Sequence, residues 1–212
     1  MRSVLAVCCL ALPLALCAQA AQEPSSANQS SAAERATAAP AVSTETLQAV
    51  VNQQFDKQYK VDASFATPYL LGDFDGDGVQ DIAIVVKTDR LPATVQIAGL
   101  SYEMVDPYHA YFGAGDIRIA RMFTATDMKS EHELAIIHGS GADGWHASEP
   151  KAKYLVINLP FDTLSTVTIM PPKKNKKHLA PMTGIRAEED RIMASVLVWN
   201  GKKYRWVPDD GE

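Results

Sequence analysis

Four aspartates and two glycines crowd into one short segment of this chain: Asp73, Asp75, Gly76, Asp77, Gly78 and Asp81. Carboxylates this close repel one another unless a positive charge lies between them. Calcium takes about six to eight oxygen ligands, and glycines permit the positive φ values of a tight loop. The spacing predicts a calcium-binding loop. The four aspartates would supply side-chain oxygens, Asp81 directly or through water, and Val79 would supply its carbonyl. The alternative is a polar turn that the aspartates merely cap.

The residues on either side of this segment distinguish two kinds of calcium loop. An EF-hand loop lies between helices and has an acidic ligand at its twelfth position, which here is Ile84. The flanks, residues 68–71 and 82–86, are instead short apolar runs, and the second is mostly β-branched. Such runs indicate strands. The acidic loop is therefore predicted to join two strands.

A strand, a D-x-D-x-D-G-x-x-D loop and a second strand resemble the FG-GAP (VCBS-type) repeat. This repeat forms calcium loops in the β-propellers of integrin alpha chains and in many bacterial secreted proteins. The resemblance covers residues 69–86 and implies the ligands Asp73, Asp75, Asp77, Val79 (carbonyl) and Asp81. Propellers repeat the unit at a fixed period, whereas this chain has one D-x-D-x-D-G segment. We therefore expect a solitary FG-GAP-like loop in a small domain.

Residues 1–20 have the features of a secretory signal peptide. Arg2 provides a positive start, residues 4–16 are apolar, and Ala18-Gln19-Ala20 offers a small-x-small cleavage site. The apolar run is short for a membrane span. The protein is therefore predicted to be exported to the periplasm or the extracellular space, with no transmembrane segment after the leader is removed.

Cys17 provides an alternative way of processing the leader. Leu14-Ala15-Leu16-Cys17 resembles a bacterial lipobox, in which the cysteine is lipidated and becomes the mature N-terminus. The residue before that cysteine is usually small, and here it is Leu16, so we expect simple cleavage after Ala20 or Ala21. All three cysteines lie in the leader. The mature domain would therefore contain no disulfide to stabilise it.

Composition divides the remaining chain in two. Residues 21–42 are mostly Ala, Ser, Gln, Pro and Glu, which bury too little apolar surface to offset the entropy of ordering. They are predicted to be a disordered linker, followed by a single globular domain at residues 43–212. The chain has a net charge of −5, and loss of Arg2 with the leader changes it to −6. This acidity argues against nucleic acid as a partner.

Apolar periodicity predicts one helix and several strands. Helical spacing is followed by Leu47, Val50, Val51 and Phe55. With Ser43 as N-cap, this predicts an amphipathic helix over residues 44–58. Strands are expected near residues 61–71, 81–88, 95–97, 117–123, 133–138 and 154–159. The predicted fold class is α+β: a mainly antiparallel β-sheet with one N-terminal amphipathic helix and a strand–calcium loop–strand unit.

The C-terminal residues predict a hairpin. Asn200-Gly201 is a preferred two-residue type I′ turn, flanked by strands at residues 192–199 and 202–207. In that pairing one face of the hairpin carries four large apolar or aromatic side chains: Leu197, Trp199, Tyr204 and Trp206. This face is the one expected to join the core.

The glycine-rich segment from His138 to His146 is a second candidate site. Its two histidines and Asp143 could bind a transition metal such as zinc, although no H-E-x-x-H spacing is present. Ser140 lies between two glycines, but a nucleophile elbow would need glycine at position 138. The alternative is a simple connection between strands with two surface histidines.

Three further features have both a functional and a structural interpretation. The basic run 173–178 would contact an anionic polymer or lipid surface, or form a solvated loop. The aromatic stretch 102–112 would bind a ligand, or pack at a sheet edge. Glu131 and Glu133 alternate along a predicted strand start and would share one solvent face. Paired carboxylates can serve as acid and base in a glycosidase, a role that needs a deep cleft and a defined separation.

The sequence favours a secreted or periplasmic calcium-binding protein of the FG-GAP-like type. The calcium ion would have a structural role, and no enzymatic activity is assigned. One alternative is an envelope-associated hydrolase with its site around His138–His146. Another is an interaction or adhesion module, anchored by lipid at Cys17 and bound to a cell-envelope or protein partner.

Overall fold

The computed structural model describes residues 41–89, 99–113, 132–170, 181–190 and 193–209. The helices are α1 (Thr44–Gln54), α2 (Pro107–Tyr111) and the 3-10 turn η3 (Gly141–Asp143). The strands are β1 (Lys60–Val61), β2 (Tyr69–Gly72), β3 (Asp81–Lys87), β4 (Glu103–Val105), β5 (Glu133–His138), β6 (Ala152–Val156), β7 (Thr163–Ile169), β8 (Met182–Glu189), β9 (Met193–Trp199) and β10 (Tyr204–Pro208).

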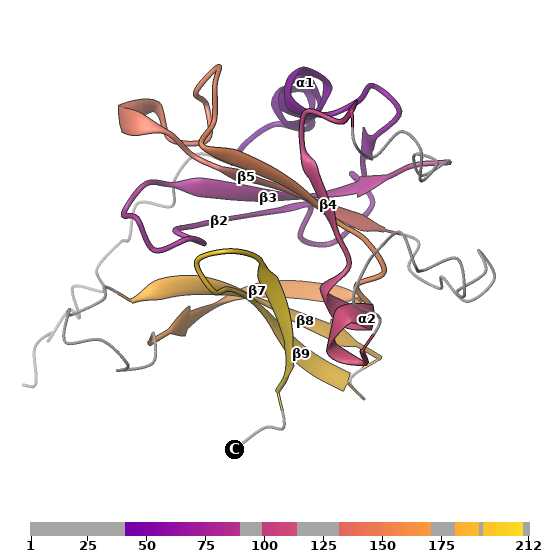
Figure 1. Cartoon of the computed structure of the whole chain (residues 1–212). Helices are drawn as coiled ribbons and strands as arrows, with labels where there is room; N and C mark the ends of the chain where they lie inside the picture. The colour runs from indigo at the N-terminus through magenta and orange to yellow at the C-terminus, as the bar shows by residue number, and fades with distance from the viewer. Residues whose placement is uncertain (1–40, 90–98, 114–131, 171–180, 191–192, 210–212) are drawn as a thin grey trace, which may run out of the picture. The chain divides into compact units, whose positions relative to one another are not determined.

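The described strands form two sheets. The first has the order β1-β3-β5-β6-β4, with β2 also pairing with β3, and the second has the order β10-β9-β8-β7. All pairs are antiparallel except β4 with β6. In Figure 1, α1 lies over one face of the first sheet and the second sheet lies against the other. The predicted fold class, mainly antiparallel β with an N-terminal helix, is confirmed.

Two hydrophobic cores cover the two faces of the first sheet. Ala83 and Val85 of β3 point into the core shared with the second sheet. Ile82, Ile84 and Val86 alternate with them and face the core beneath α1. Since β3 is covered on both faces, its sequence is a continuous apolar run rather than an alternating one. The same holds for β5, whose six residues are all buried.

Helix α1 begins where the sequence predicts but ends earlier. The Ser43 side chain accepts a hydrogen bond from the Thr46 amide (3.2 Å), as an N-cap residue does. The helix ends at Gln54 rather than residue 58, because Phe55 adopts an extended conformation and packs its ring on Tyr102, 5.1 Å between centroids. Tertiary packing of an aromatic residue therefore overrides helical periodicity at this end.

The strand predicted at residues 61–71 is two separate strands, β1 and β2. Asp62 interrupts the run, because its carboxylate accepts the Ser64 amide (3.1 Å) and its carbonyl accepts the Phe65 amide (3.2 Å). Such aspartate-capped turns compete with a continuous strand. The segment 62–68 connects these two strands, because β1 pairs with residues 86–87 of β3 and β2 pairs with residues 81–84 of the same strand.

For the C-terminal hairpin, the prediction of which side chains share a face is confirmed, and the prediction of a two-residue type I′ turn is wrong. Tyr204 pairs with Trp199, so the connection has four residues, 200–203, instead of two. Gly201 has a positive φ of 89° but Asn200 does not, which excludes a type I′ turn. The side chain of Asn200 accepts the amides of Lys202 and Lys203, both at 3.1 Å. The register shifts by two residues, so each side chain keeps its predicted face.

Several predictions lie outside the described residues. These are the leader 1–20 with Cys17, nearly all of the linker 21–42, the strands at 95–97 and 117–123, Glu131 and the basic run 173–178. Among the described helices, none is long and apolar enough to cross a membrane.

Candidate metal centre

The acidic loop connects two paired strands at one end of the first sheet. β2 and β3 are antiparallel, and Gly72 pairs with Asp81, so the intervening residues form a closed loop above that pair. The hairpin therefore brings Asp73, at the start of the loop, close to Asp81, at its end. On the other side of β3, Ile82 pairs with Ile137, which places the end of β5 beside the same loop.

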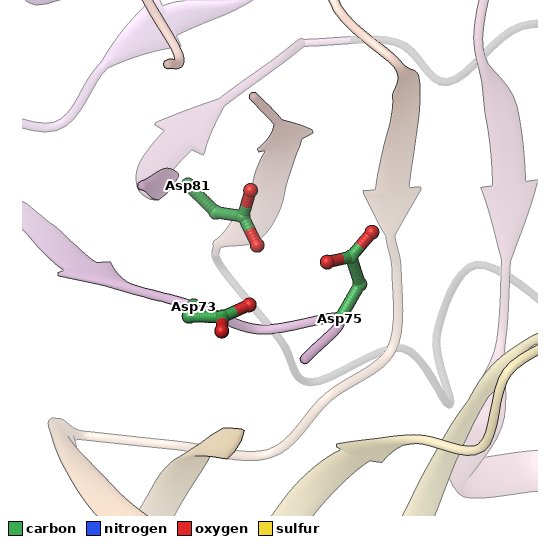
Figure 2. A group of neighbouring side chains, drawn as sticks. All are labelled: Asp73, Asp75 and Asp81. Atoms are coloured by element: carbon green, nitrogen blue, oxygen red, sulfur yellow. The ribbon is translucent and has the colours of Figure 1, made fainter. Parts of the chain in front are cut away.

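Three of the aspartates converge on one point. Asp73, Asp75 and Asp81 each offer a carboxylate oxygen, and these oxygens lie within 4.8 Å of one another. Figure 2 shows the three carboxyl groups facing a common space. Asp81 is buried, with 1% of its surface exposed, and the other two are partly buried. This group could hold a metal ion.

Asp73 organises the loop backbone. Its Oδ1 accepts the amides of Gly76 (2.7 Å) and Asp77 (3.0 Å), and its Oδ2 accepts the amide of Gly78 (2.8 Å). Gly76 and Gly78 have φ values of 77° and 85°, which the loop needs in order to turn these amides inward. A carboxylate has about four acceptor positions, so three such bonds leave Asp73 about one for a cation.

Asp81 joins the loop to the rest of the sheet. Its Oδ2 accepts the amide of Phe74 and its Oδ1 accepts the amide of Gly139, both at 2.7 Å. Burial raises the pKa of Asp81 to about 7; the two amides oppose this shift, and the charges of Asp75 and Asp73 add to it. A nearby cation would favour the ionised carboxylate.

The remaining predicted ligands, Asp77 and Val79, are outside the three-residue group. The Val79 amide donates to Asp77 Oδ1 (2.8 Å), and Asp77 Oδ2 accepts the ammonium of Lys151 (2.6 Å). Burial acts to raise the pKa of Asp77, but the hydrogen bonds from Lys151 and the Val79 amide, together with the charge of Lys151, outweigh it and hold this pKa below its usual value. That the Val79 carbonyl binds metal remains a prediction.

Lys151 and His138 also belong to this site, although no pattern in the sequence predicts them there. Lys151 Nζ lies 2.5 Å from Asp75 Oδ2, and His138 Nδ1 lies 3.4 Å from the same oxygen. His138 is the last residue of β5, and it pairs with Ala152 at the start of β6. His138 reaches the acidic loop because β5 pairs with β3. The sequence could have indicated its place in the site only if this strand order were already known.

His138 is a buried residue rather than a surface histidine. Its Nε2 lies 2.6 Å from the hydroxyl of Tyr204, and its ring packs against Trp199 and Tyr154. Only 1% of the side chain is exposed. Burial lowers the pKa of His138 to about 4, so the imidazole is neutral at neutral pH. The expectation of two surface histidines is therefore wrong for His138.

The rest of the glycine-rich segment supports the acidic loop. His146 is exposed and stacks on Trp145, whose indole donates to Gln80 Oε1 (3.2 Å). A Cβ at Gly139 would lie 2.3 Å from the Gln80 carbonyl oxygen, so the two backbones touch at this glycine. Among the described residues, the group able to hold a metal is the aspartate trio, and His138, Asp143 and His146 form no such group.

Glu133, one of the two carboxylates weighed as a glycosidase pair, is buried rather than solvent-facing. It begins β5, is 7% exposed, and its Oε2 has no hydrogen-bond partner among the described residues. Burial raises the pKa of Glu133 to about 7. Both faces of β5 are covered by other parts of the protein. The alternating spacing of the two glutamates did not indicate this burial.

The aromatic stretch contains the short helix α2, which packs against β10. Tyr108 and Tyr111 contact Trp206, with ring centroids 5.3 and 4.8 Å apart. This arrangement agrees with the packing interpretation of the stretch for these two tyrosines.

Comparisons of the chain with protein-family models, with curated proteins and with solved structures found no match. The functional interpretation therefore depends on the site itself, whose chemistry is that of a compact set of carboxylate oxygens. Such a set could hold a hard cation.

Proposed function

We propose that this protein is an exported calcium-binding protein of the FG-GAP-like type, in which the ion has a structural role. The observation that carries this proposal is the convergence of Asp73, Asp75 and Asp81 within 4.8 Å, on a loop between two paired strands. The strand–loop–strand arrangement is the context that the FG-GAP resemblance requires, and it differs from the helix flanks of an EF-hand.

The donor set fits calcium better than zinc. All three groups are carboxylates, whereas zinc sites in proteins are built mainly from cysteine and histidine. Calcium–oxygen distances are about 2.3–2.6 Å, so two ligands of one calcium ion lie at most about 5 Å apart. The 4.8 Å limit on the aspartate oxygens satisfies that condition. Asp77, the Val79 carbonyl and water would complete the shell.

Calcium would act by joining segments that carry like charges. The ion would offset the repulsion among the four loop carboxylates, and through Asp81 it would secure the contact with Gly139. Extracellular calcium modules bind with Kd values of about 10⁻⁴–10⁻³ M. At about 1 mM calcium, binding to the folded state alone stabilises by roughly 0.4–1.4 kcal/mol. This role is structural because it needs no change of conformation elsewhere.

The test is thermal unfolding of the domain in about 1 mM calcium and in chelator. For a domain of this size the stabilisation corresponds to a rise in Tm of about 1–5 °C. Asp75→Asn should remove this calcium-dependent rise, whereas Asp143→Asn, which changes an exposed aspartate of the neighbouring segment, should retain it. Absence of any calcium-dependent shift in the wild-type protein would refute the proposal.

Export is supported by the leader features of residues 1–20 and is tested separately. The intact mass of the mature protein distinguishes cleavage after Ala20 or Ala21 from lipidation at Cys17, which adds acyl chains. A mature protein that retains the leader would contradict export.

A further inference from the structure

Lys151 places a positive charge directly on the acidic loop. Its ammonium lies 2.5 Å from Asp75 Oδ2 and 2.6 Å from Asp77 Oδ2. The two carboxylates differ in exposure: the Asp75 side chain is 3% exposed and that of Asp77 is 28% exposed. Lys151 is itself 48% exposed, so it reaches from solvent onto a nearly buried carboxylate.

Both oxygens of Asp75 already have partners within the chain. Oδ1 accepts the amide of Asp77 (3.2 Å), and Oδ2 is contacted by Lys151 and, at 3.4 Å, by the neutral imidazole of His138. A cation that binds Asp75 at Oδ2 has to share that oxygen with an ammonium ion at hydrogen-bond distance, and a cation at Oδ1 lies on the same carboxylate as the ammonium. Two cations on one carboxylate oxygen repel each other strongly in such a poorly hydrated place.

We infer that Lys151 is an internal competitor for the cation position on Asp75, and that it sets the affinity and charge selectivity of the loop. This inference rests on the proposed calcium function. An incoming ion displaces the ammonium from Asp75. A divalent ion has the stronger attraction to the four aspartates and succeeds, whereas a monovalent ion brings no more charge than the lysine it replaces.

The displacement needs only a side-chain movement. The Lys151 amide donates to the carbonyl of His138 (3.0 Å), which fixes the backbone just before β6. The four-carbon side chain is flexible and half exposed, so the ammonium can move into water while the strand remains in place. Exchange of lysine for metal is therefore compatible with an unchanged fold.

Calorimetric titration with calcium chloride tests the inference on four forms of the domain. Lys151→Met removes the competing charge and keeps an unbranched side chain, so the calcium Kd should fall by about five- to tenfold. Lys151→Arg retains the charge and should stay within about threefold of the wild type. Lys153→Met is the matched control, because Lys153 lies two residues further along the chain, in β6, and contacts Ser101 Oγ at 3.4 Å instead of the acidic loop. It should change the Kd by less than about twofold.

A second measurement follows the ammonium itself. Acetylation of Lys151, measured by mass spectrometry at low reagent concentration, should be slow in chelator and faster in saturating calcium. Acetylation of Lys153 should not respond. A lysine that only supports the loop would not change its reactivity on metal binding.

The outcomes separate this inference from the proposed function. Equal or weaker calcium binding by Lys151→Met, with binding by the wild type, overturns the inference and leaves the calcium proposal intact. No binding by either form refutes the calcium proposal, and the inference fails with it. Binding by Lys151→Met alone refutes the calcium proposal for the native protein and overturns the inferred displacement, because calcium would then fail to displace the ammonium from Asp75.

Discussion

The acidic loop, residues 73–81, and the glycine-rich segment 139–146 lie against each other and resemble each other in composition. Each contains two glycines with positive φ and several ionisable side chains. In the acidic loop the carboxylates turn inward and accept backbone amides. In the glycine-rich segment Asp143 and His146 are exposed, and the backbone of Gly139 makes the contact with Asp81.

The difference shows what makes a polar segment a candidate binding site. Ionisable residues and glycines are common to both segments, but only one directs its charged atoms to a single point. The other provides a close-packed wall, with its backbone against Gln80. Convergence of ligand atoms, rather than content of ionisable residues, is the property that supports cation binding.

The largest expected effect comes from Gly139→Ala, which tests whether the glycine-rich segment supports the acidic loop. Its Cβ would lie 2.3 Å from the Gln80 carbonyl oxygen and 2.6 Å from the Gly144 carbonyl carbon, both backbone atoms. We expect a loss of about 3 kcal/mol in the free energy of unfolding, measured with urea.

Gly141→Ala is the matched control for this substitution. No atom lies within 4 Å of its Cβ position, although its φ is +60°. The expected loss is about 1 kcal/mol, from backbone strain alone. Equal losses of unfolding free energy in the two variants would show that the close contact of Gly139 with Gln80 does not contribute to stability.

The next largest effect is expected from Glu133→Gln. This substitution tests how a buried carboxyl group outside the aspartate cluster changes the pH dependence of stability. The folded-state pKa of Glu133 is raised to about 7 from 4.5, so the folded protein binds more protons than the unfolded chain between these values. The contribution of Glu133 to stability is therefore fully present below about pH 4.5 and is lost as the pH rises through about 7. Relative to wild type, the variant should gain roughly 2–3 kcal/mol between pH 4 and pH 8, measured by urea unfolding.

The calcium Kd of Glu133→Gln should equal that of the wild type, because Glu133 is not among the clustered carboxylates. A flat difference between variant and wild type across this pH range would mean that Glu133 is ionised without penalty in the folded protein.

A smaller effect is expected from a matched pair of aspartates, one from each side of the comparison. Asp81→Asn places an amide group where a carboxylate oxygen now accepts Phe74 or Gly139. A donor would then face a donor, and we expect a loss of about 2 kcal/mol in chelator at pH 8. Asp143→Asn changes an exposed side chain and should stay within about 0.5 kcal/mol. Similar values for the pair would contradict the distinction drawn between the two segments.

Local patterns in the sequence predicted the features that depend on neighbouring residues. Ser43 caps α1 at the expected residue, and the apolar runs of β3 and β5 lie where they were predicted. The face of the C-terminal hairpin was correct even though its turn was not, because a register shift of two residues preserves side-chain alternation.

Features that depend on distant residues could not be predicted in this way. Phe55 leaves the helical pattern in order to pack on Tyr102, which is 47 positions later in the chain. His138 looked like a surface histidine because nothing in its own segment reveals Tyr204, 66 residues away. Glu133 was predicted to be exposed because the alternating positions of Glu131 and Glu133 do not indicate that both faces of β5 are covered.

For the candidate metal centre, the sequence alone determined that Asp73, Asp75 and Asp81 occupy a tight loop between two strands. That part is local, since carboxylate spacing, glycine positions and strand propensity all lie within eleven residues, 72–82. The tertiary structure decided what those carboxylates contact. The pairing of β3 with β5, and of β5 with β6, brings Gly139 to Asp81 and Lys151 to Asp75. Lys151 is 76 residues from Asp75, so only the order of strands in the sheet could place its charge on the loop.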